Sequence, residues 1–235
     1  SPIDAVSDID FDPAGNLYLF NDWSQIVRVD NGMVNYVEPV NGTYNSAARF
    51  NLAVVNVDLV YFVNYLENRI YRLIGTSKSD FVTSYPLLAP SSIAYAPKID
   101  SLVFADTDND RIMRISLLDG NVYGMVGYPG GSPFVDNIDA SAMTLARPSV
   151  VDYNPITGKI FFVDGSSNKV MYVDAAGKVH LLAGTGAMQF TGDGGPATAA
   201  GLNDPRAITV DSRGNAYIAD YGNHAVRMVV GGALP

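Results

Sequence analysis

The chain has 235 residues, of which 48% are hydrophobic and 17% are charged, and it contains no cysteine. This length and apolar content suffice for one sizeable core, and all-β domains of this size are often single. A formal net charge of −9 argues against electrostatic attraction to nucleic acid, and no cluster of lysine or arginine offsets it. The lack of cysteine excludes disulfides, thiolate metal sites and cysteine nucleophiles.

Membrane insertion is not expected from the hydropathy pattern. The longest apolar stretches are strand-sized, as at residues 59–63, whereas a transmembrane helix needs about 20 apolar residues. The sequence begins at Ser1 without a methionine or the charged and apolar regions of a signal peptide. We therefore expect a soluble chain that is either exported and processed or trimmed.

An internal repeat runs through the chain. Five apolar runs end in Asn or Asp at intervals of 42 to 58 residues, namely at Asn21, Asn64, Asp106, Asp164 and Asp220. These intervals fit the four-stranded blades of a β-propeller with loops of variable length. We expect a first and second strand before each Asn or Asp and a third strand after a polar turn. The expected repeats cover about residues 6–40, 50–86, 90–127, 147–184 and 204–235 of a single domain, 1–235.

Turn and strand signals complete the blades. Pro90, Pro148 and Pro205 are expected to open first strands, where a missing N–H costs no ladder bond. Asn-Gly at 31–32 and Asp-Gly at 119–120 are strong hairpin signals. Fourth strands are expected at residues 33–37, 81–85, 122–126 and 179–182. Only residues 231–235 follow the third strand of the last repeat, so either this blade has three strands or the chain is a fragment.

The last repeat resembles a known family. Residues 192–202 read Gly-Asp-Gly-Gly-Pro-Ala-Thr-Ala-Ala-Gly-Leu, and with residues 205–227 they are similar to NHL repeats of the bacterial and teneurin-like form. The resemblance is close at the C-terminal end, weaker over 144–186 and 91–127, and rests on spacing in the first two repeats. It implies an all-β β-propeller of NHL type, with five recognisable blades in a ring of five or six.

Two acidic segments have the look of calcium loops. Carboxylates at Asp106, Asp108 and Asp110 could converge on a hard cation, but no Gly stands at the sharp turn and no bidentate Glu follows. Residues 10–16 similarly read as a turn between two strands. We interpret both segments as capped turns.

Other catalytic patterns are incomplete. Residues 192–195, Gly-Asp-Gly-Gly, lack the Lys-Ser/Thr of a phosphate loop and are expected to form an excursion between blades, with a short helical turn within 197–202. The only two histidines are His180, in an outer strand, and His224, in a turn, and both are interpreted as structural. The two glutamates, Glu38 and Glu67, are not at inner-strand ends, so no metal set is expected.

The remaining candidates are surface residues. In a propeller, the loops after second strands and before first strands share one face, and aromatic and arginine side chains are frequent anchors of protein interfaces. The residues expected on or near this face are Trp23, Tyr65, Leu66, Tyr221, Arg49, Arg147 and Arg206. Asn41 begins an Asn-Gly-Thr glycosylation pattern, which favours export.

These observations favour a non-catalytic interaction or scaffold module of an exported or cell-surface protein. It would present one propeller face to a protein or glycan partner and hold no cofactor. The alternative is a metal-dependent propeller enzyme of lyase or lactonase type, with ligands from Asp and Asn at the starts of inner strands. RNA binding, which the NHL resemblance also implies as an option, is disfavoured by the acidic charge.

Overall fold

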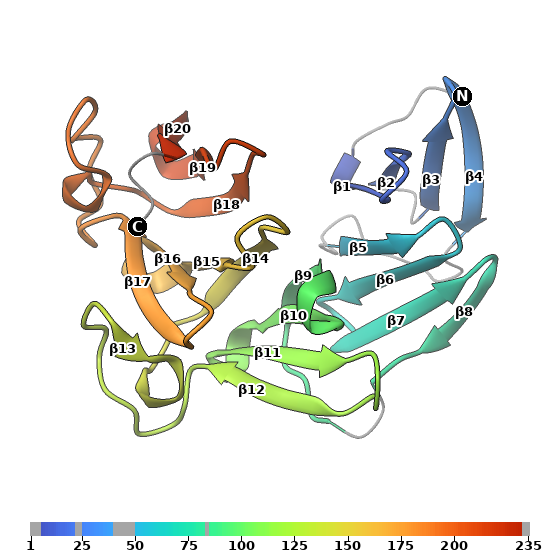
Figure 1. The fold of residues 1–235 in the computed structure, drawn as a ribbon, viewed down its shortest axis with the longest axis horizontal. Coiled ribbons are helices and arrows are strands. Elements are labelled where there is room, and N and C mark those ends of the chain that lie inside the picture. The colour runs from blue at the N-terminus through green and yellow to red at the C-terminus, as the bar shows by residue number, and fades with distance from the viewer. Residues whose placement is uncertain (1–5, 22–24, 40–49, 83–84, 232–235) are drawn as a thin grey trace. The chain divides into compact units, whose positions relative to one another are not determined.

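The computed structural model describes residues 6–21, 25–39, 50–82 and 85–231. Its strands form five small sheets that follow one another along the chain (Figure 1). Every strand within a sheet runs antiparallel to its neighbour in the pairings observed. Each sheet is one blade, so the expected all-β β-propeller with five recognisable blades is confirmed, and of the two blade numbers left open the structure has five.

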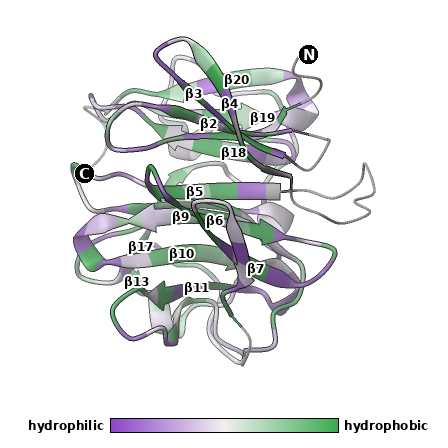
Figure 2. Cartoon of the chain, turned by 90° about the vertical axis from the view of Figure 1, so that its right-hand side faces the viewer, coloured by the Kyte–Doolittle hydropathy of each residue, from purple (hydrophilic) through white to green (hydrophobic). Residues whose placement is uncertain are grey.

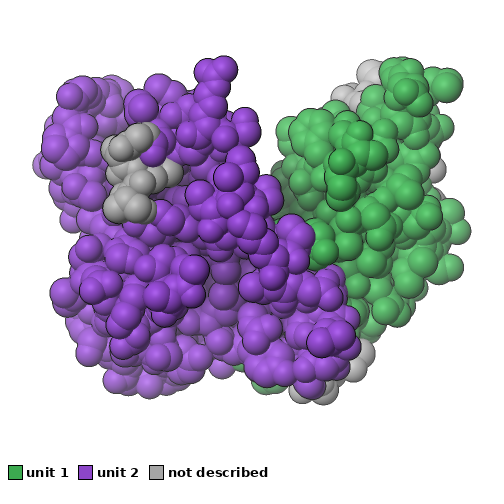
Figure 3. Space-filling model, in the orientation of Figure 1, with its two compact units in different colours: residues 1–95 green, residues 96–235 purple. Residues whose placement is uncertain are grey.

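Two compact units divide the chain inside strand β9, between Tyr95 and Ala96 (Figure 3). The first unit, Ser1–Tyr95, contains blades 1 and 2. The second unit, Ala96–Pro235, contains blades 4 and 5 and most of blade 3.

The blades of the first unit have four strands each, in chain order. Blade 1 consists of β1 (Val6–Phe11), β2 (Leu17–Asn21), β3 (Gln25–Asp30) and β4 (Met33–Pro39). Blade 2 consists of β5 (Phe50–Asn56), β6 (Leu59–Asn64), β7 (Arg69–Ile74) and β8 (Ser77–Asp80).

Blades 3 to 5 add short 3-10 helices to the same plan. Blade 3 consists of β9 (Pro90–Ala96), β10 (Ser101–Asp106), β11 (Arg111–Ser116) and β12 (Val122–Val126), with η1 (Pro97–Ile99) and η2 (Thr107–Asn109). Blade 4 consists of β14 (Pro148–Tyr153), β15 (Ile160–Asp164), β16 (Lys169–Val173) and β17 (Lys178–Ala183), with η4 (Gly165–Ser167). Blade 5 consists of β18 (Pro205–Val210), β19 (Ala216–Asp220) and β20 (Ala225–Val229), with η5 (Ala197–Ala199) and η6 (Tyr221–Asn223).

Two details of the sheets differ from the sequence-based expectation. The fourth strand of blade 2 is β8, not residues 81–85, because the chain reverses tightly and pairs Ile74 with Ser77. Phe81 lies beyond that strand, and its ring centroid is 4.6 Å from that of Tyr61. Blade 4 also gains an outer strand, β13 (Ile138–Asp139), followed by η3 (Ala140–Ala142), from the long connection after blade 3.

Apolar side chains fill the space between neighbouring blades. Strands are mainly hydrophobic in colour in Figure 2. Between blades 1 and 2, the ring centroids of Phe20 and Phe62 lie 5.6 Å apart, and Phe62 stacks on Tyr71 at 5.1 Å. A second cluster joins blades 4 and 5 through fully or nearly fully buried residues such as Phe161 and Ile218. Burial of each large side chain contributes about 1.5–3 kcal/mol.

Polar side chains join the innermost strands of the first unit. In blade 1, Asp8 Oδ2 accepts hydrogen bonds from the Leu52 N–H and from Asn51 Nδ2, both at 2.8 Å. In blade 2, Asn51 Oδ1 in turn accepts the Ile93 N–H. Burial raises the pKa of Asp8 to about 7 and also raises that of Asp10, which accepts the Val54 N–H. Asp8 and Asn51 occupy equivalent positions and each accepts a backbone N–H of the next inner strand, one as an ionisable side chain and the other as a neutral one.

Candidate functional site

The turn after each second strand is built on its terminal Asn or Asp. In blade 5 the Asp220 carboxylate is fully buried and accepts the Asn203 N–H at 2.7 Å, Asn223 Nδ2 at 2.8 Å and Arg227 Nη1 at 3.2 Å. The turn itself is η6, which ends at His224 with a φ of +53°. A buried carboxylate with this many donors holds the turn in one conformation.

The last residue of these turns also bonds to the start of the following blade. Three turn residues with positive φ accept the N–H of the residue that precedes the next inner strand: Asn68 from Ala89 at 2.6 Å, Asp110 from Arg147 at 2.7 Å, and Asn168 from Asp204 at 2.8 Å. Turns and strand starts are therefore neighbours within each unit. We call the surface of the second unit formed by residues 107–110, 146–148, 165–168, 203–206 and 221–224 the turn face.

In blade 5 the turn face carries a fixed arginine–tyrosine pair. The Arg206 guanidinium carbon lies 3.6 Å from the ring centroid of Tyr221, and 53% of Tyr221 remains exposed. Asp204 Oδ2 accepts hydrogen bonds from Arg206 Nε at 2.9 Å and Nη2 at 2.6 Å. The hydrogen bond to Asp204 also raises the pKa of Arg206. Carboxylate and ring together orient a side chain that would otherwise sample many rotamers.

Arg147 forms a separate contact between blades 3 and 4. Its Nη1 lies 2.6 Å from Asp108 Oδ1. Nearby, Thr107 Oγ1 donates a hydrogen bond to the carbonyl of Pro148 at 2.8 Å. The segment 106–110, which the sequence presented as a doubtful calcium loop, is a capped turn: Asp106 Oδ2 accepts Asn109 Nδ2 at 2.8 Å.

The excursion before blade 5 brings further apolar groups to this face. Met188 is 71% exposed and Phe190 is 57% exposed. Asn223 Nδ2 donates to the Gln189 carbonyl at 3.0 Å, which ties the excursion to the turn after Tyr221. Met188 and Phe190 were not among the residues expected from the sequence. The only signal was two bulky apolar residues beside a glycine-rich segment.

A single arginine fixes this excursion. Arg227 Nε and Nη2 lie 2.8 and 2.6 Å from Asp193 Oδ1, and Nη2 donates to the Thr191 carbonyl at 3.0 Å. The same guanidinium lies 5.0 Å from the Phe190 ring centroid. It therefore joins the Gly-Asp-Gly-Gly segment to the buried Asp220 carboxylate. The expected short helical turn in the excursion is confirmed as η5.

Of the other expected residues, two lie in the first unit and three lie outside the described residues. Leu66 is 51% exposed and Tyr65 is half-buried, both in the blade 2 turn. Trp23, Arg49 and the glycosylation candidate Asn41 lie outside the described residues. Among the described side chains, Arg147 makes no ion pair or ring contact with the Arg206–Tyr221 pair.

Across the described ranges, no three His, Cys, Asp or Glu side chains converge as a metal site would require. His180 Nε2 lies 3.1 Å from Asp174 Oδ2, and its ring stacks on Tyr172 with centroids 5.0 Å apart. His224 ends the η6 turn. In the same described part of the chain, no helix is long and apolar enough to cross a membrane.

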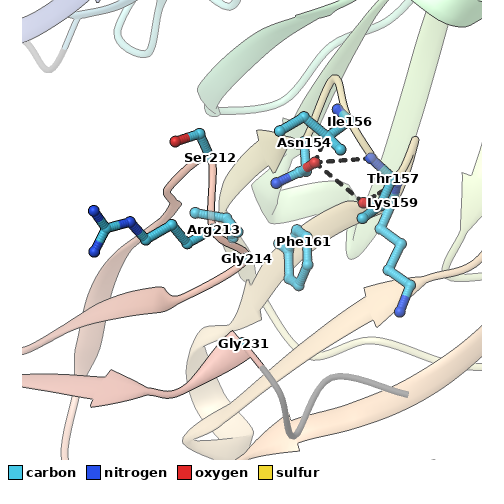
Figure 4. A pocket seen from close by; sticks show the side chains of 10 residues that line it. Asn154, Ile156, Thr157, Lys159, Phe161, Ser212, Arg213, Gly214 and Gly231 are labelled. Carbon is cyan, nitrogen blue, oxygen red and sulfur yellow. Dashed lines mark hydrogen bonds between the residues drawn. The ribbon is translucent and has the colours of Figure 1, made fainter.

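A small pocket lies at the hairpins between first and second strands of blades 4 and 5 (Figure 4). Its volume is about 200 Å³. The lining comes from the β14–β15 and β18–β19 connections and includes Asn154, Lys159, Phe161, Val210 and Arg213. These hairpins lie at the opposite strand ends from the turn face.

Comparison with known proteins identifies the repeat and the fold. The family profile described as NHL repeat matches residues 202–227. No curated protein matches the sequence. Among solved structures, a Bacteroides thetaiotaomicron protein of unknown function has a TM-score of 0.74 at 18% identity, covering 92% of this chain and 56% of its own.

Two further structures give the range of proteins that share the fold. A streptogramin B lyase has a TM-score of 0.68 at 15% identity, covering 98% of this chain and 67% of its own. A nidogen/laminin complex has a TM-score of 0.72 at 16% identity, covering 98% of this chain and 78% of the matched chain. The chain thus spans little more than half of the length of the Bacteroides thetaiotaomicron protein. The chain is thus a five-bladed β-propeller whose residues 202–227 match the NHL repeat.

Proposed function

We propose that the protein is an interaction module that binds a protein or glycan through the turn face of its second unit. The observation that carries this proposal is the oriented Arg206–Tyr221 pair, together with the exposed Phe190 and Met188 of the excursion that Asn223 ties to the same turn. Arginine and tyrosine are enriched among residues that dominate binding energy, and a pre-ordered pair loses less side-chain entropy on binding. An exported or cell-surface location is part of the proposal, supported by the Asn41 acceptor pattern.

The nidogen/laminin structure supports this proposal as an instance of the same fold within a protein complex. The streptogramin B lyase supports the alternative, a metal-dependent enzyme of lyase type. Between the two, the described residues favour binding, since they hold an ordered surface pair and no convergent set of metal ligands.

Purified protein should be screened on arrays of secreted proteins and of glycans. We expect at least one partner whose binding weakens about 30-fold or more in Arg206→Ala and Tyr221→Ala, as for residues at the centre of an interface. The chain offers a matched control in blade 3, where Arg114 lies 4.3 Å from the ring centroid of Tyr123, which is 38% exposed. Arg114→Ala and Tyr123→Ala should leave that binding unchanged.

Two results would overturn the proposal. One is a set of partners that bind equally well to both pairs of variants. The other is metal-dependent turnover of lactones or esters by protein that carries a stoichiometric tightly bound ion, which would establish the enzyme instead.

A further inference from the structure

The pocket between the hairpins of blades 4 and 5 has an unusual charge for this protein. Ten residues line it, and they include two cations, Lys159 and Arg213, and no carboxylate. The whole chain carries a formal net charge of −9. Arg213 is exposed and forms no ion pair with any described carboxylate. The lining itself therefore carries two cations, while the carboxylates of Asp211 and Asp152 lie beside it and accept the N–H groups of Arg213 and Val210.

The wall of the pocket also holds the amide group of a mostly buried asparagine. Asn154 is 2% exposed, and its Oδ1 accepts the N–H groups of Ile156 at 3.0 Å and Thr157 at 2.9 Å. Its Nδ2 donates to no other described residue. In Figure 4 this amide nitrogen is turned away from Thr157, toward the hairpin of Ser212 and Arg213. An amide N–H without a protein acceptor can donate a hydrogen bond to a ligand or to water.

Comparison between repeats shows that this amide replaces a carboxylate. The equivalent hairpin residue is Asp12 in blade 1, which accepts the N–H groups of Ala14 and Asn16 at 2.9 Å. In blade 5 it is Asp211, which accepts those of Arg213 and Asn215 at 2.9 and 2.8 Å. Asn154 Oδ1 caps its hairpin in a similar way, through the N–H groups two and three positions ahead. Its second atom is a donor where blades 1 and 5 have a negative oxygen, whereas the blade 2 hairpin is also capped by an asparagine, Asn56.

Part of the remaining lining is apolar, and Thr157 and Ser212 add hydroxyl groups. Phe161, only 1% exposed, and Val210 form part of the pocket wall together with Gly214 and Gly231. A volume of about 200 Å³ is below the ~300–1,000 Å³ usual for drug-sized ligands. The occupant must therefore be small, with an apolar part that can contact Phe161.

We propose that this pocket is a binding site for a small organic anion, a carboxylate or phosphate ester with an apolar or planar body. Arg213 and Lys159 supply the charge for the anionic group, Asn154 Nδ2 donates a hydrogen bond, and Phe161 and Val210 contact the apolar part. The site is distinct from the turn face, so it adds to the proposed function and does not depend on it.

Benzoate, phenyl phosphate and benzamide are suitable probes, because benzamide has nearly the shape of benzoate without its charge. Titrations of ¹⁵N-labelled protein should shift the amide signals of Thr157, Gly214 and Gly231 with either anion. We expect dissociation constants of about 1–10 mM, the range that ligands of this size reach. Benzamide should bind at least tenfold more weakly. The stronger of the two anions indicates whether the site prefers carboxylates or phosphate esters.

The decisive variant is Asn154→Asp, which keeps the capping oxygen and, as Asp12 and Asp211 show, is compatible with the hairpin. It should weaken benzoate binding at least tenfold while the melting temperature stays close to that of the unmodified chain. Arg213→Ala should weaken it about three- to tenfold. Arg206→Ala, on the turn face, should leave it unchanged.

Three results would overturn the proposal. The anions might produce no shifts at the pocket amides up to tens of millimolar (about 50 mM), which exceeds the expected constants severalfold. Benzamide might bind as well as benzoate. Asn154→Asp might fold normally and bind benzoate with unchanged affinity.

Discussion

Blades 2 and 5 build the same turn with different chemistry. In blade 5, a fully buried aspartate, Asp220, is paired with Arg227 on the neighbouring strand. In blade 2, the equivalent residues are the neutral Asn64 and the aromatic Tyr71, whose hydroxyl contacts Glu67 and whose ring stacks on Phe62. The backbone turn is alike in both, so the geometry does not require a charge. In blade 5, Arg227 of this ion pair also binds the excursion that carries Phe190.

This contrast also explains where the NHL repeat profile matches. The matched segment, residues 202–227, runs from the buried Leu202 to Arg227 and includes Asp220. In blade 2, substitution of the charged residues by Asn64 and Tyr71 leaves the strands and turn intact but removes the sequence signature. A profile reads residue types, whereas the blade depends on burial and hydrogen bonding, which several residue types satisfy.

The largest expected effect comes from removal of the cation in blade 5. Arg227→Met should lower the free energy of unfolding by about 3–5 kcal/mol, because it leaves the Asp220 carboxylate buried without its charged partner. Chemical denaturation gives the change directly. Arg213→Met, at an exposed arginine without an ion pair, is the control and should cost less than about 0.5 kcal/mol.

A second variant tests whether blade 5, like blade 2, is stable with uncharged residues in place of its ion pair. Asp220→Asn combined with Arg227→Met should recover a large part of the lost stability. If the double variant is as unstable as Arg227→Met alone, the charge of Asp220 is not the cause of the loss.

The reverse experiment introduces a charge into blade 2. Asn64→Asp should cost about 2 kcal/mol at pH 7, because Asn64 is 1% exposed and Tyr71 stands where blade 5 has its arginine. Burial should raise the pKa of the new carboxyl above its unfolded value, so the folded state binds the proton more tightly. The cost should therefore shrink as the pH falls toward about 4. If Asn64→Asp lowers the free energy of unfolding by the same amount at pH 4 and at pH 7, this explanation is contradicted.

The smallest expected effect concerns the inner strands of blades 1 and 2. The pKa of Asp8 is raised to about 7, so this residue lowers stability progressively as the pH rises from about 4 to about 7. Asp8→Asn, which copies the natural Asn51, should raise stability by about 1–2 kcal/mol at pH 7.5 and flatten this dependence. Stability curves of both proteins between pH 4 and 8 provide the measurement, and parallel curves would rule out Asp8 as the source.

The sequence predicted much of the fold because its signals are local. The Asn or Asp that ends each second strand, the prolines that open first strands and the Gly-containing hairpins are all visible within a few residues. The fourth strand of blade 2 was predicted wrongly at 81–85, since the apolar residues there suggested a strand, whereas the turn at Gly75 places β8 earlier. Strand β13 was missed because it lies within a long connection without a repeat signal.

The candidate sites were less predictable, because they depend on residues far apart in the chain. Tyr221 and Arg206 were expected on one face, but their stacking and the contribution of Asp204 could not be read from spacing. Phe190 approaches Arg227 across 37 positions of sequence. Asn154 was not among the expected residues, because only its place in the folded hairpin relates it to Asp12 and Asp211.

The bonds between turns and strand starts also have a consequence for how the protein folds. Ala89, Arg147 and Asp204 all have positive φ directly before a proline, a conformation that the isolated chain disfavours. In each case the N–H is held by Asn68, Asp110 or Asn168 of the preceding blade. A new blade therefore begins most readily on a completed turn, as in repeat proteins whose units add to their neighbours. Within each unit, we therefore expect a completed turn to favour formation of the blade that follows it.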